Sequence, residues 1–409
     1  MNLLFKFKTA TLALCLLATQ LAIGNNSFFE IQKINGSDAN NFSEFGYASD
    51  IDGDWAVIGA PQNGNGAVHV FKRQGDIWIE SQKLTSSDPG TADFFGAAVD
   101  IDGNRMLIGA PNDDNVRGID AGAFYYFEYD GSTWIEVQKI YTSVSNSGSE
   151  FGLSLSLSGN RAVVGVDTKN TFSGSMVVYQ FNGENWAYQT QIFSPNTQTD
   201  SRRFARILKV KGDLIAVSDF QDDDQGALYV YEFDAGNWSL VQRLTASDGS
   251  LDQNFGTSID LQENTVAIGA SGDTANAGAV YIFSNASSLL WTEQIKLSAS
   301  DSIANGFFGG TGMVLKDNLL LVGASQNLLT GTGSTPTGAA YLFQNQTTGW
   351  QEIQKITPSD GAFDDQFGFS LAMDSDHILV GARYEDDNGM NSGSAYLYLS
   401  DLIFNDSFE

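Results

Sequence analysis

One sequence pattern recurs seven times along this chain and constrains its fold more than any other feature. Each copy has a Phe-Gly pair, a short alternating run, a tight turn, an apolar run ending in Gly-Ala, an aromatic segment and a Trp-led segment. Successive copies lie 50 to 59 residues apart. Four strand-like segments per unit at this period are typical of propeller blades. The Phe-Gly pairs begin at Phe45, Phe95, Phe151, Phe255, Phe308 and Phe367, with a degenerate copy at Phe204-Ala205.

The first copy shows how one unit becomes four antiparallel strands. Residues 47–51 alternate, and Asp52-Gly53 is a pair that tolerates the positive φ angles of a two-residue hairpin. Residues 55–60 are almost continuously apolar, as expected for a strand buried on both faces. The segments 66–71 and 78–84 supply the third and fourth strands. We expect the Phe, the apolar second strand and the aromatic third strand to pack between neighbouring blades.

The two ends of the repeat region predict a closed ring. The seventh unit stops after its third strand, at 393–399, whereas residues 28–34 (FFEIQKI) copy the fourth-strand segment 350–356 (WQEIQKI). Pairing of the N-terminal segment with the last unit would remove an open sheet edge. We therefore predict an all-β, seven-bladed propeller of four-stranded antiparallel blades within 25–400, closed by the N-terminal strand. The expected blades span 45–84, 95–140, 151–192, 204–244, 255–297, 308–356, and 367–399 plus 28–34.

The N-terminus and the charge of the chain indicate where it acts. Residues 1–24 have the basic start, short apolar run and small-residue cleavage site of a secretory signal, and Cys15 within them is the only cysteine. No later run is long and apolar enough to span a membrane. A net charge of −28 excludes nucleic acid and anionic surfaces as partners. The sequence thus predicts a secreted or cell-envelope protein of bacterial type, and residues 401–409 form an acidic tail.

The Phe-Gly and Gly-Ala marks together resemble the FG-GAP repeat of integrin α-subunit propellers and of bacterial exported proteins. The Gly-Ala marks are Gly59-Ala60-Pro61, Gly109-Ala110-Pro111, Gly269-Ala270, Gly323-Ala324 and Gly381-Ala382, with drifted copies at Gly165-Val166-Asp167 and Val217-Ser218-Asp219. The resemblance implies a propeller used in recognition or adhesion. It also implies calcium loops between first and second strands, but the turns at Asp50–Asp54 and Asp100–Gly103 are too short to wrap a cation. No cofactor is expected with certainty, and Ca²⁺ remains an open alternative.

The loops predict that one face of the ring carries any binding site. Loops between second and third strands and between blades are long and acidic, and such loops on a rigid scaffold commonly bind ligands. For the unrepeated triplet Asp222-Asp223-Asp224, a solvated acidic loop and a loose cation site are both open interpretations. We expect Asp→Asn changes in the candidate residues to weaken binding without lowering stability. Ser-Asp pairs recur in five inter-blade loops, where local capping is the expected role. The candidate binding residues are Asp113, Asp114, Asp120, Asp222, Asp223, Asp224, Glu385, Asp386 and Asp387.

Catalytic motifs are missing from the sequence. His69 and His377 are the only histidines and fall in different units, where core or edge roles are expected. No nucleophile elbow, metalloprotease motif or phosphate loop occurs. We therefore predict a monomeric, non-catalytic recognition or adhesion scaffold for an extracellular protein or glycan. The alternative is a carbohydrate-active propeller, either a lectin that stacks sugars on the fourth-strand tryptophans or a carboxylate-dependent glycosidase or lyase.

Overall fold

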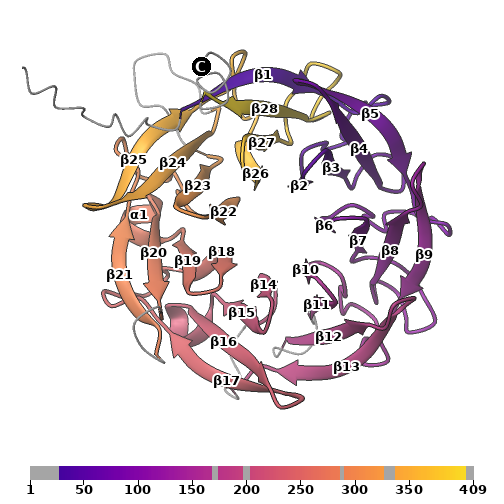
Figure 1. Ribbon diagram of the computed structural model, residues 1–409, viewed down its shortest axis with the longest axis horizontal. Helices are drawn as coiled ribbons and strands as arrows, with labels where there is room; N and C mark the ends of the chain where they lie inside the picture. The colour runs from indigo at the N-terminus through magenta and orange to yellow at the C-terminus, as the bar shows by residue number, and fades with distance from the viewer. Residues whose placement is uncertain (1–26, 168–173, 197–202, 286–289, 327–336, 402–409) are drawn as a thin grey trace, which may run out of the picture.

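A computed structural model describes residues 27–167, 174–196, 203–285, 290–326 and 337–401. The predicted signal peptide and the tail from residue 402 onward lie outside the described residues. Seven four-stranded antiparallel sheets stand around a central opening, with the first strand of each blade innermost (Figure 1). The predicted seven-bladed propeller is confirmed.

The first four blades follow the chain in order. Blade 1 contains β2 (Ala48–Asp52), β3 (Trp55–Ala60), β4 (Ala67–Gln74) and β5 (Ile77–Leu84). Blade 2 contains β6 (Ala98–Asp102), β7 (Arg105–Ala110), β8 (Ala123–Tyr129) and β9 (Trp134–Ile140). Blade 3 contains β10 (Leu155–Ser158), β11 (Arg161–Val166), β12 (Ser175–Phe181) and β13 (Trp186–Phe193). Blade 4 contains β14 (Leu208–Lys211), β15 (Leu214–Asp219), β16 (Ala227–Asp234) and β17 (Asn237–Leu244), with the 3-10 turn η1 at Asp222–Asp224.

The remaining blades complete the ring. Blade 5 contains β18 (Phe255–Gln262), β19 (Thr265–Ala270), β20 (Ala279–Ser284) and β21 (Thr292–Leu297), with the short helix α1 at Asp273–Asn276. Blade 6 contains β22 (Met313–Lys316), β23 (Leu319–Ala324), β24 (Ala339–Gln346) and β25 (Gly349–Ile356). Blade 7 contains β26 (Phe367–Met373), β27 (His377–Ala382), β28 (Ser394–Ser400) and β1 (Phe28–Ile34).

Strand β1 closes the ring as predicted. It pairs antiparallel with β28, from Phe28 opposite Ser400 to Ile34 opposite Ala395. The N-terminal strand thereby becomes the outer strand of blade 7, beside the last strand of the chain (Figure 1). This pairing covers an edge that would otherwise be open to another chain.

The recurring marks pack one blade on the next, as expected. Phe95 is fully buried, and it shares one core cluster with Tyr125 of its own blade and with Val57 and Val68 of blade 1. The glycine of Gly-Ala is required by a close approach: a Cβ on Gly109 would lie 2.0 Å from the carbonyl oxygen of Gly152 in the next blade. Gly152 itself has a φ of +95°, which disfavours any side chain. Both glycines of the repeat are thus fixed by inter-blade spacing.

In blade 4, the position equivalent to the Gly-Ala mark lies one residue away from where the sequence pattern predicts it. The amide of Ala205 donates to the carbonyl of Ser218 at 3.0 Å, just as the amide of Gly96 donates to that of Gly109 at 2.9 Å. Ser218 therefore takes the position of the Gly-Ala glycine, and the predicted match at Val217-Ser218-Asp219 is wrong by one position. The blades remain far enough apart here to accommodate the serine side chain.

The loops sort onto two faces. Loops between second and third strands, together with the inter-blade loops, form what we call the long-loop face. The tight turns between first and second strands and between third and fourth strands form the opposite, tight-turn face. Gly53 and Gly103 in two of these turns have positive φ angles, as the sequence predicts.

Candidate functional site

Three of the nine predicted binding residues are buried. Asp113, Asp222 and Glu385 expose 1%, 0% and 5% of their surface, respectively. The expectation that substitutions there would spare stability is therefore wrong for these three. A buried carboxylate needs a cation or several hydrogen bonds to offset its lost hydration, and each of the three has such partners.

Asp113 shows the arrangement that recurs around the ring. Its Oδ2 accepts hydrogen bonds from the Tyr125 hydroxyl at 2.9 Å and from Lys139 Nζ at 2.7 Å. Asp88, from the inter-blade loop, binds the same tyrosine and the same lysine at 2.9 and 2.6 Å. Tyrosine and lysine come from the third and fourth strands of blade 2, so one ammonium neutralises two loop carboxylates.

Equivalent clusters occupy other blades. Asp222 accepts from Tyr229 and from Arg243 Nε, the latter at 3.0 Å. In blade 5, Lys296 Nζ lies 2.7 Å from both Asp248 and Asp273. The sequence analysis did not select Asp273, although it holds the same place in its blade as Asp113.

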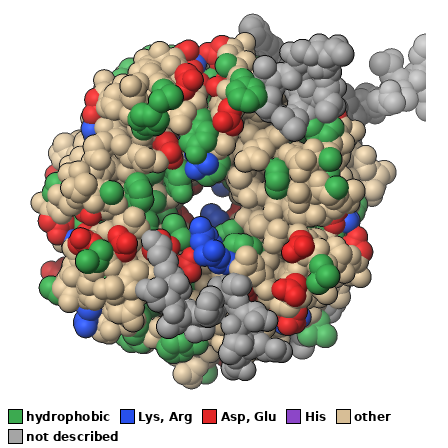
Figure 2. Space-filling model, turned by 180° about the vertical axis from the view of Figure 1, so that it is seen from behind, with side chains coloured by type: hydrophobic (Ala, Val, Ile, Leu, Met, Phe, Trp, Pro, Cys, Tyr) green, Lys and Arg blue, Asp and Glu red, His purple; other side chains and the backbone are tan. Residues whose placement is uncertain are grey.

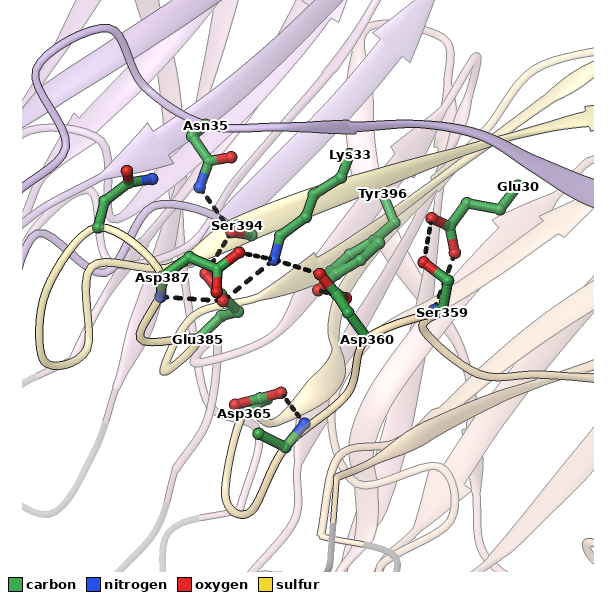
Figure 3. Close-up of polar contacts among 12 residues, drawn as sticks. Glu30, Lys33, Asn35, Ser359, Asp360, Asp365, Glu385, Asp387, Ser394 and Tyr396 are labelled. Carbon is green, nitrogen blue, oxygen red and sulfur yellow. Dashed lines mark hydrogen bonds and ion pairs between the residues drawn. The ribbon is translucent and has the colours of Figure 1, made fainter.

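The cluster in blade 7 gathers three carboxylates around one lysine (Figure 3). Lys33 Nζ, from the closing strand β1, lies 2.7 Å from Asp360, 3.0 Å from Glu385 and 2.5 Å from Asp387. The hydrogen bond from Lys33 lowers the pKa of Asp387. The ammonium thus fills the centre of the carboxylate group, where a loosely bound cation would otherwise sit, and it also ties β1 to its blade.

The recurring Ser-Asp pairs link blades instead of capping their own loops, so the local-capping expectation is wrong for their main contacts. Ser87 donates through its amide and hydroxyl to both oxygens of Glu136, at 2.9 and 2.6 Å. Each pair follows the outer strand of one blade and binds the outer strand of the next. The five serine–glutamate contacts are Ser37–Glu80, Ser87–Glu136, Ser247–Glu293, Ser300–Glu352 and Ser359–Glu30.

A second set of contacts joins the outer strands directly. Gln82 donates to the carbonyl of Trp134 at 2.8 Å and accepts from its amide at 2.9 Å. The same double bridge joins five of the seven blade junctions, and its members are Gln32–Trp78, Gln82–Trp134, Gln138–Trp186, Gln242–Trp291 and Gln354–Phe28.

Five of the six fourth-strand tryptophans are buried in the ring wall, and Trp238 in blade 4 is partly exposed. Trp78, Trp134 and Trp291 expose 1%, 2% and 2% of their surface. The ring of Trp134 meets that of Trp55 from blade 1 edge-on at 5.5 Å. These side chains have no face left for a sugar, so the expected sugar-stacking alternative fails at these positions.

Both histidines are core residues, in line with the sequence prediction. His69 takes the tyrosine position in blade 1, and its Nδ1 lies 2.9 Å from Glu80. His377 begins β27 on the tight-turn face, where it forms the one grouping of potential metal ligands found among the described residues, with Asp374 and Asp376. Arg73 Nη1 lies 3.4 Å from Asp376, so an arginine already neutralises this group.

The other members of the predicted set remain apart. Asp114 and Asp120 belong to blade 2, Asp223 and Asp224 to blade 4, and Asp386 to blade 7. Asp114 accepts a hydrogen bond from the amide of Asp120 at 2.9 Å within one loop. At least one blade separates each loop from the next in the set, so the structure does not bring them into a single site.

The central opening contains two adjoining cavities. A cavity of about 540 Å³ lies between the innermost strands. A second cavity of about 380 Å³ adjoins it through Tyr47 and Arg206 and reaches the loop residues Gln62, Asn112 and Tyr384. We call this second cavity the channel mouth. Lys and Arg side chains gather around the central opening (Figure 2).

Arg383 is fixed at one side of the channel mouth. Its guanidinium carbon lies 3.7 Å from the ring centroid of Phe369 and 4.4 Å from that of Tyr384. Its Nε donates to Gln366 at 2.8 Å. Glu44 shares the mouth, and burial raises the pKa of its carboxyl although Arg383 opposes the shift.

Arg206 lines the same cavity from blade 4. Its Nη1 donates to Asp167 Oδ2 at 3.0 Å, and Arg203 Nη1 lies 3.6 Å from the same oxygen. Burial raises the pKa of the Tyr47 hydroxyl, whereas Arg383 and Arg206 both lower it. Tyr47, Arg206 and Arg383 all line this one cavity.

These two arginines are not among the predicted binding residues, which are all acidic. A signal was present: Arg206 directly follows the degenerate mark Phe204-Ala205, where other units have Tyr47, Ala97 or Leu153. Arg383 directly follows Gly381-Ala382, where the first two units have proline. In a repeat protein, a charged residue that replaces the commoner uncharged residues of a position marks a place where the fold does not dictate the choice.

Among the residues that the structure describes, no helix is both long and apolar enough to cross a membrane. No curated protein sequence matches the chain. Two solved structures share the fold. The WD40 domain of Toxoplasma gondii coronin is 11% identical, with a TM-score of 0.55 over 92% of this chain and 86% of that one. A chain of a mitotic checkpoint complex is 11% identical, with a TM-score of 0.53 over 95% and 98%.

The family comparison agrees with the repeat marks. The model of the FG-GAP repeat matches residues 28–71, 78–127, 238–283 and 350–398. These matches include the closing strand and most of blades 1, 2, 5 and 7, whereas residues 128–237, with their drifted marks, and residues 284–349 lie outside them. Repeat marks, matched segments and ring topology agree, and the chain is an FG-GAP repeat protein folded as a seven-bladed propeller.

Proposed function

We propose that this chain is a secreted or cell-envelope recognition scaffold that binds an extracellular protein or polysaccharide through its long-loop face and has no catalytic activity. FG-GAP repeats and the propeller fold fit a binding or scaffold role. The observation that carries the proposal is the channel mouth, where Arg206 and Arg383 occupy positions that the repeat does not specify. The exposed carboxylates Asp114, Asp223, Asp224 and Asp386 would form the outer part of the same surface.

The proposed scaffold works as a monomer without a cofactor. Lysine and arginine side chains neutralise the loop carboxylates that would otherwise favour calcium, as Lys33 does for Asp360, Glu385 and Asp387. Chelation should therefore leave the melting temperature unchanged. A rise of the melting temperature with added calcium would assign the metal a part in the fold, because a ligand stabilises the state that binds it.

A lectin is the form of the carbohydrate alternative that the structure favours. The buried tryptophans cannot stack on sugars, but the channel mouth combines aromatic rings with amides and carboxylates. Such a mixture suits hydroxyl-rich ligands. A hydrolytic activity would require a pair of carboxyl groups flanking a bound sugar bond.

The test is a binding screen of the chain without its signal, against glycans and exported proteins, with and without calcium. Asp114→Asn on the long-loop face should weaken binding of any partner found. Asp76→Asn, in an exposed turn of the tight-turn face, is the matched control and should leave it unchanged. Partners that respond only to Asp76→Asn would contradict the proposed face, and turnover of a bound glycan would contradict a non-catalytic role.

A further inference from the structure

The channel mouth presents a fixed guanidinium, and among the described residues its ion-pair partner is Glu44. Stacking on Phe369 and Tyr384 holds the plane of Arg383, and Gln366 takes its Nε. Its Nη1 lies 3.9 Å from Glu44 Oε2, which is too long for a hydrogen bond. A planar guanidinium held in this way is suited to a two-point hydrogen bond with a carboxylate.

A second guanidinium supports the same assignment. Arg206 lines the cavity with Arg383, and 38% of its side chain is exposed. Its Nη1 donates a hydrogen bond to the carboxylate of Asp167. Arg206 and Arg383 balance the carboxylates of Glu44 and Glu150 in the lining, so the mouth is a local exception to the repulsion that anions meet elsewhere on a chain with net charge −28.

The rest of the lining selects a hydroxyl-rich ligand over a plain anion. Gln62 and Asn112 bring amides that both donate and accept, and Glu44 and Glu150 bring acceptors. Tyr47 adds an aromatic face beside them. The volume of about 380 Å³ falls within the range of small-ligand sites.

We infer that the channel mouth binds the uronic acid residue of a glycan, with its carboxylate on Arg383 and Arg206 and its hydroxyls on the amides and glutamates. This inference rests on the proposed function and names its ligand class. Because the surface outside the mouth is acidic, the site takes a terminal uronate residue and not the middle of a polyuronate chain.

The test is isothermal titration of the chain without its signal, using a disaccharide that ends in glucuronate and its neutral glucose analogue. We expect saturable one-to-one binding of the uronate and at least tenfold weaker binding of the analogue. Arg383→Met and Arg206→Gln should each lower the affinity at least tenfold. Arg383→Lys should also lower it, because an ammonium keeps the charge but not the two-point geometry.

Arg117→Gln is the matched control, since Arg117 is exposed on a loop of the same face outside the mouth. It should leave the affinity unchanged, and thermal melting of every variant confirms folding. Equal binding of the neutral analogue, or an acidic peptide bound more tightly than the uronate, would overturn the inference. A partner that responds to Asp114→Asn in a chain that ignores uronate would leave the proposed function standing and refute this ligand alone.

Discussion

The sector around blades 3 and 4 differs from the rest of the ring in how neighbouring blades are joined. Five junctions carry the serine–glutamate contact, whereas the junctions on either side of blade 3 have no Ser-Asp pair in sequence. The junction from blade 3 to blade 4 also has Thr190 where regular outer strands place the bridging glutamine. Asp167, Arg203 and Arg206 all belong to this sector. The repeated polar residues therefore join neighbouring blades. Arg206, which departs from the repeat, lines the channel mouth instead.

Removal of residues 28–34 is the most severe test of the regular part. It takes away the outer strand of blade 7 together with Lys33, leaving β28 as an open edge and Glu385 without its cation. We expect loss of cooperative unfolding and aggregation of the purified chain. Circular dichroism melting and light scattering measure both. A soluble deletion variant with the parent melting temperature would refute closure by β1.

The next largest effect compares one structural position in two sectors. Gly109→Ser places a Cβ within 2.0 Å of a backbone oxygen and should cost about 3 kcal/mol or more in the free energy of unfolding. Ser218→Gly, at the equivalent position of blade 4, should cost no more than about 1 kcal/mol. Chemical denaturation of the two variants measures the difference. Similar losses in both would mean that the spacing of blade 4 is not wider.

The next prediction concerns the pH dependence of stability at one position that is acidic in blade 7 and neutral in blade 5. Asp365 and Gln253 each stand two residues before the Phe-Gly phenylalanine, and both are buried. Burial raises the pKa of Asp365 to about 6, and nearby Glu385 adds to the rise. The folded state thus binds this proton more tightly than the unfolded state, so the stability from this group falls as the pH rises from about 4 through about 6.

Asp365→Asn should remove that dependence. We expect it to stabilise the chain by roughly 1–2 kcal/mol at pH 7.5 and to have little effect near pH 4. Melting curves over this pH range check it, with Gln253→Asn as a control whose effect should not vary with pH. A variant that loses stability most at pH 7.5 would contradict a raised pKa.

The smallest effect concerns the glutamine bridge. Gln82→Leu removes two hydrogen bonds to the backbone of Trp134 and should cost about 1–2 kcal/mol. Thr190→Gln at the blade 3 position should restore a bridge to the next blade and stabilise by a few tenths of a kcal/mol. Chemical denaturation measures both. A destabilised Thr190→Gln variant would mean that this junction has no room for the bridge.

Much of the fold could be predicted because the sequence pattern of a blade recurs seven times. The match between residues 28–34 and 350–356 identifies the closing strand. The recurrence of Gly109 in the Gly-Ala pair likewise marks a position where neighbouring blades approach closely. The polar network was harder to predict. Asp113 looked like a solvated loop residue because Lys139, which neutralises it, lies 26 residues away in another strand.

The channel mouth could not be predicted from spacing at all. Arg206 and Arg383 are 177 residues apart and meet at one cavity only because a ring brings blades 4 and 7 to a shared opening. The sequence did contain their departure from the repeat pattern. A comparison of each unit position by position would have selected them, whereas a search for carboxylates selected residues that the fold had already neutralised.

Thermal unfolding of one matched pair tests the central claim most directly, namely that cations at repeated positions hold the ring while those at unrepeated positions serve the mouth. Lys139→Met should lower the melting temperature by several degrees, because it leaves Asp113 buried and without its cation, at a cost of about 2–4 kcal/mol. Arg206→Gln should lower the melting temperature by a smaller amount, since its side chain is partly exposed and Arg203 stays 3.6 Å from the buried Asp167. Equal losses in the two variants would contradict the claim.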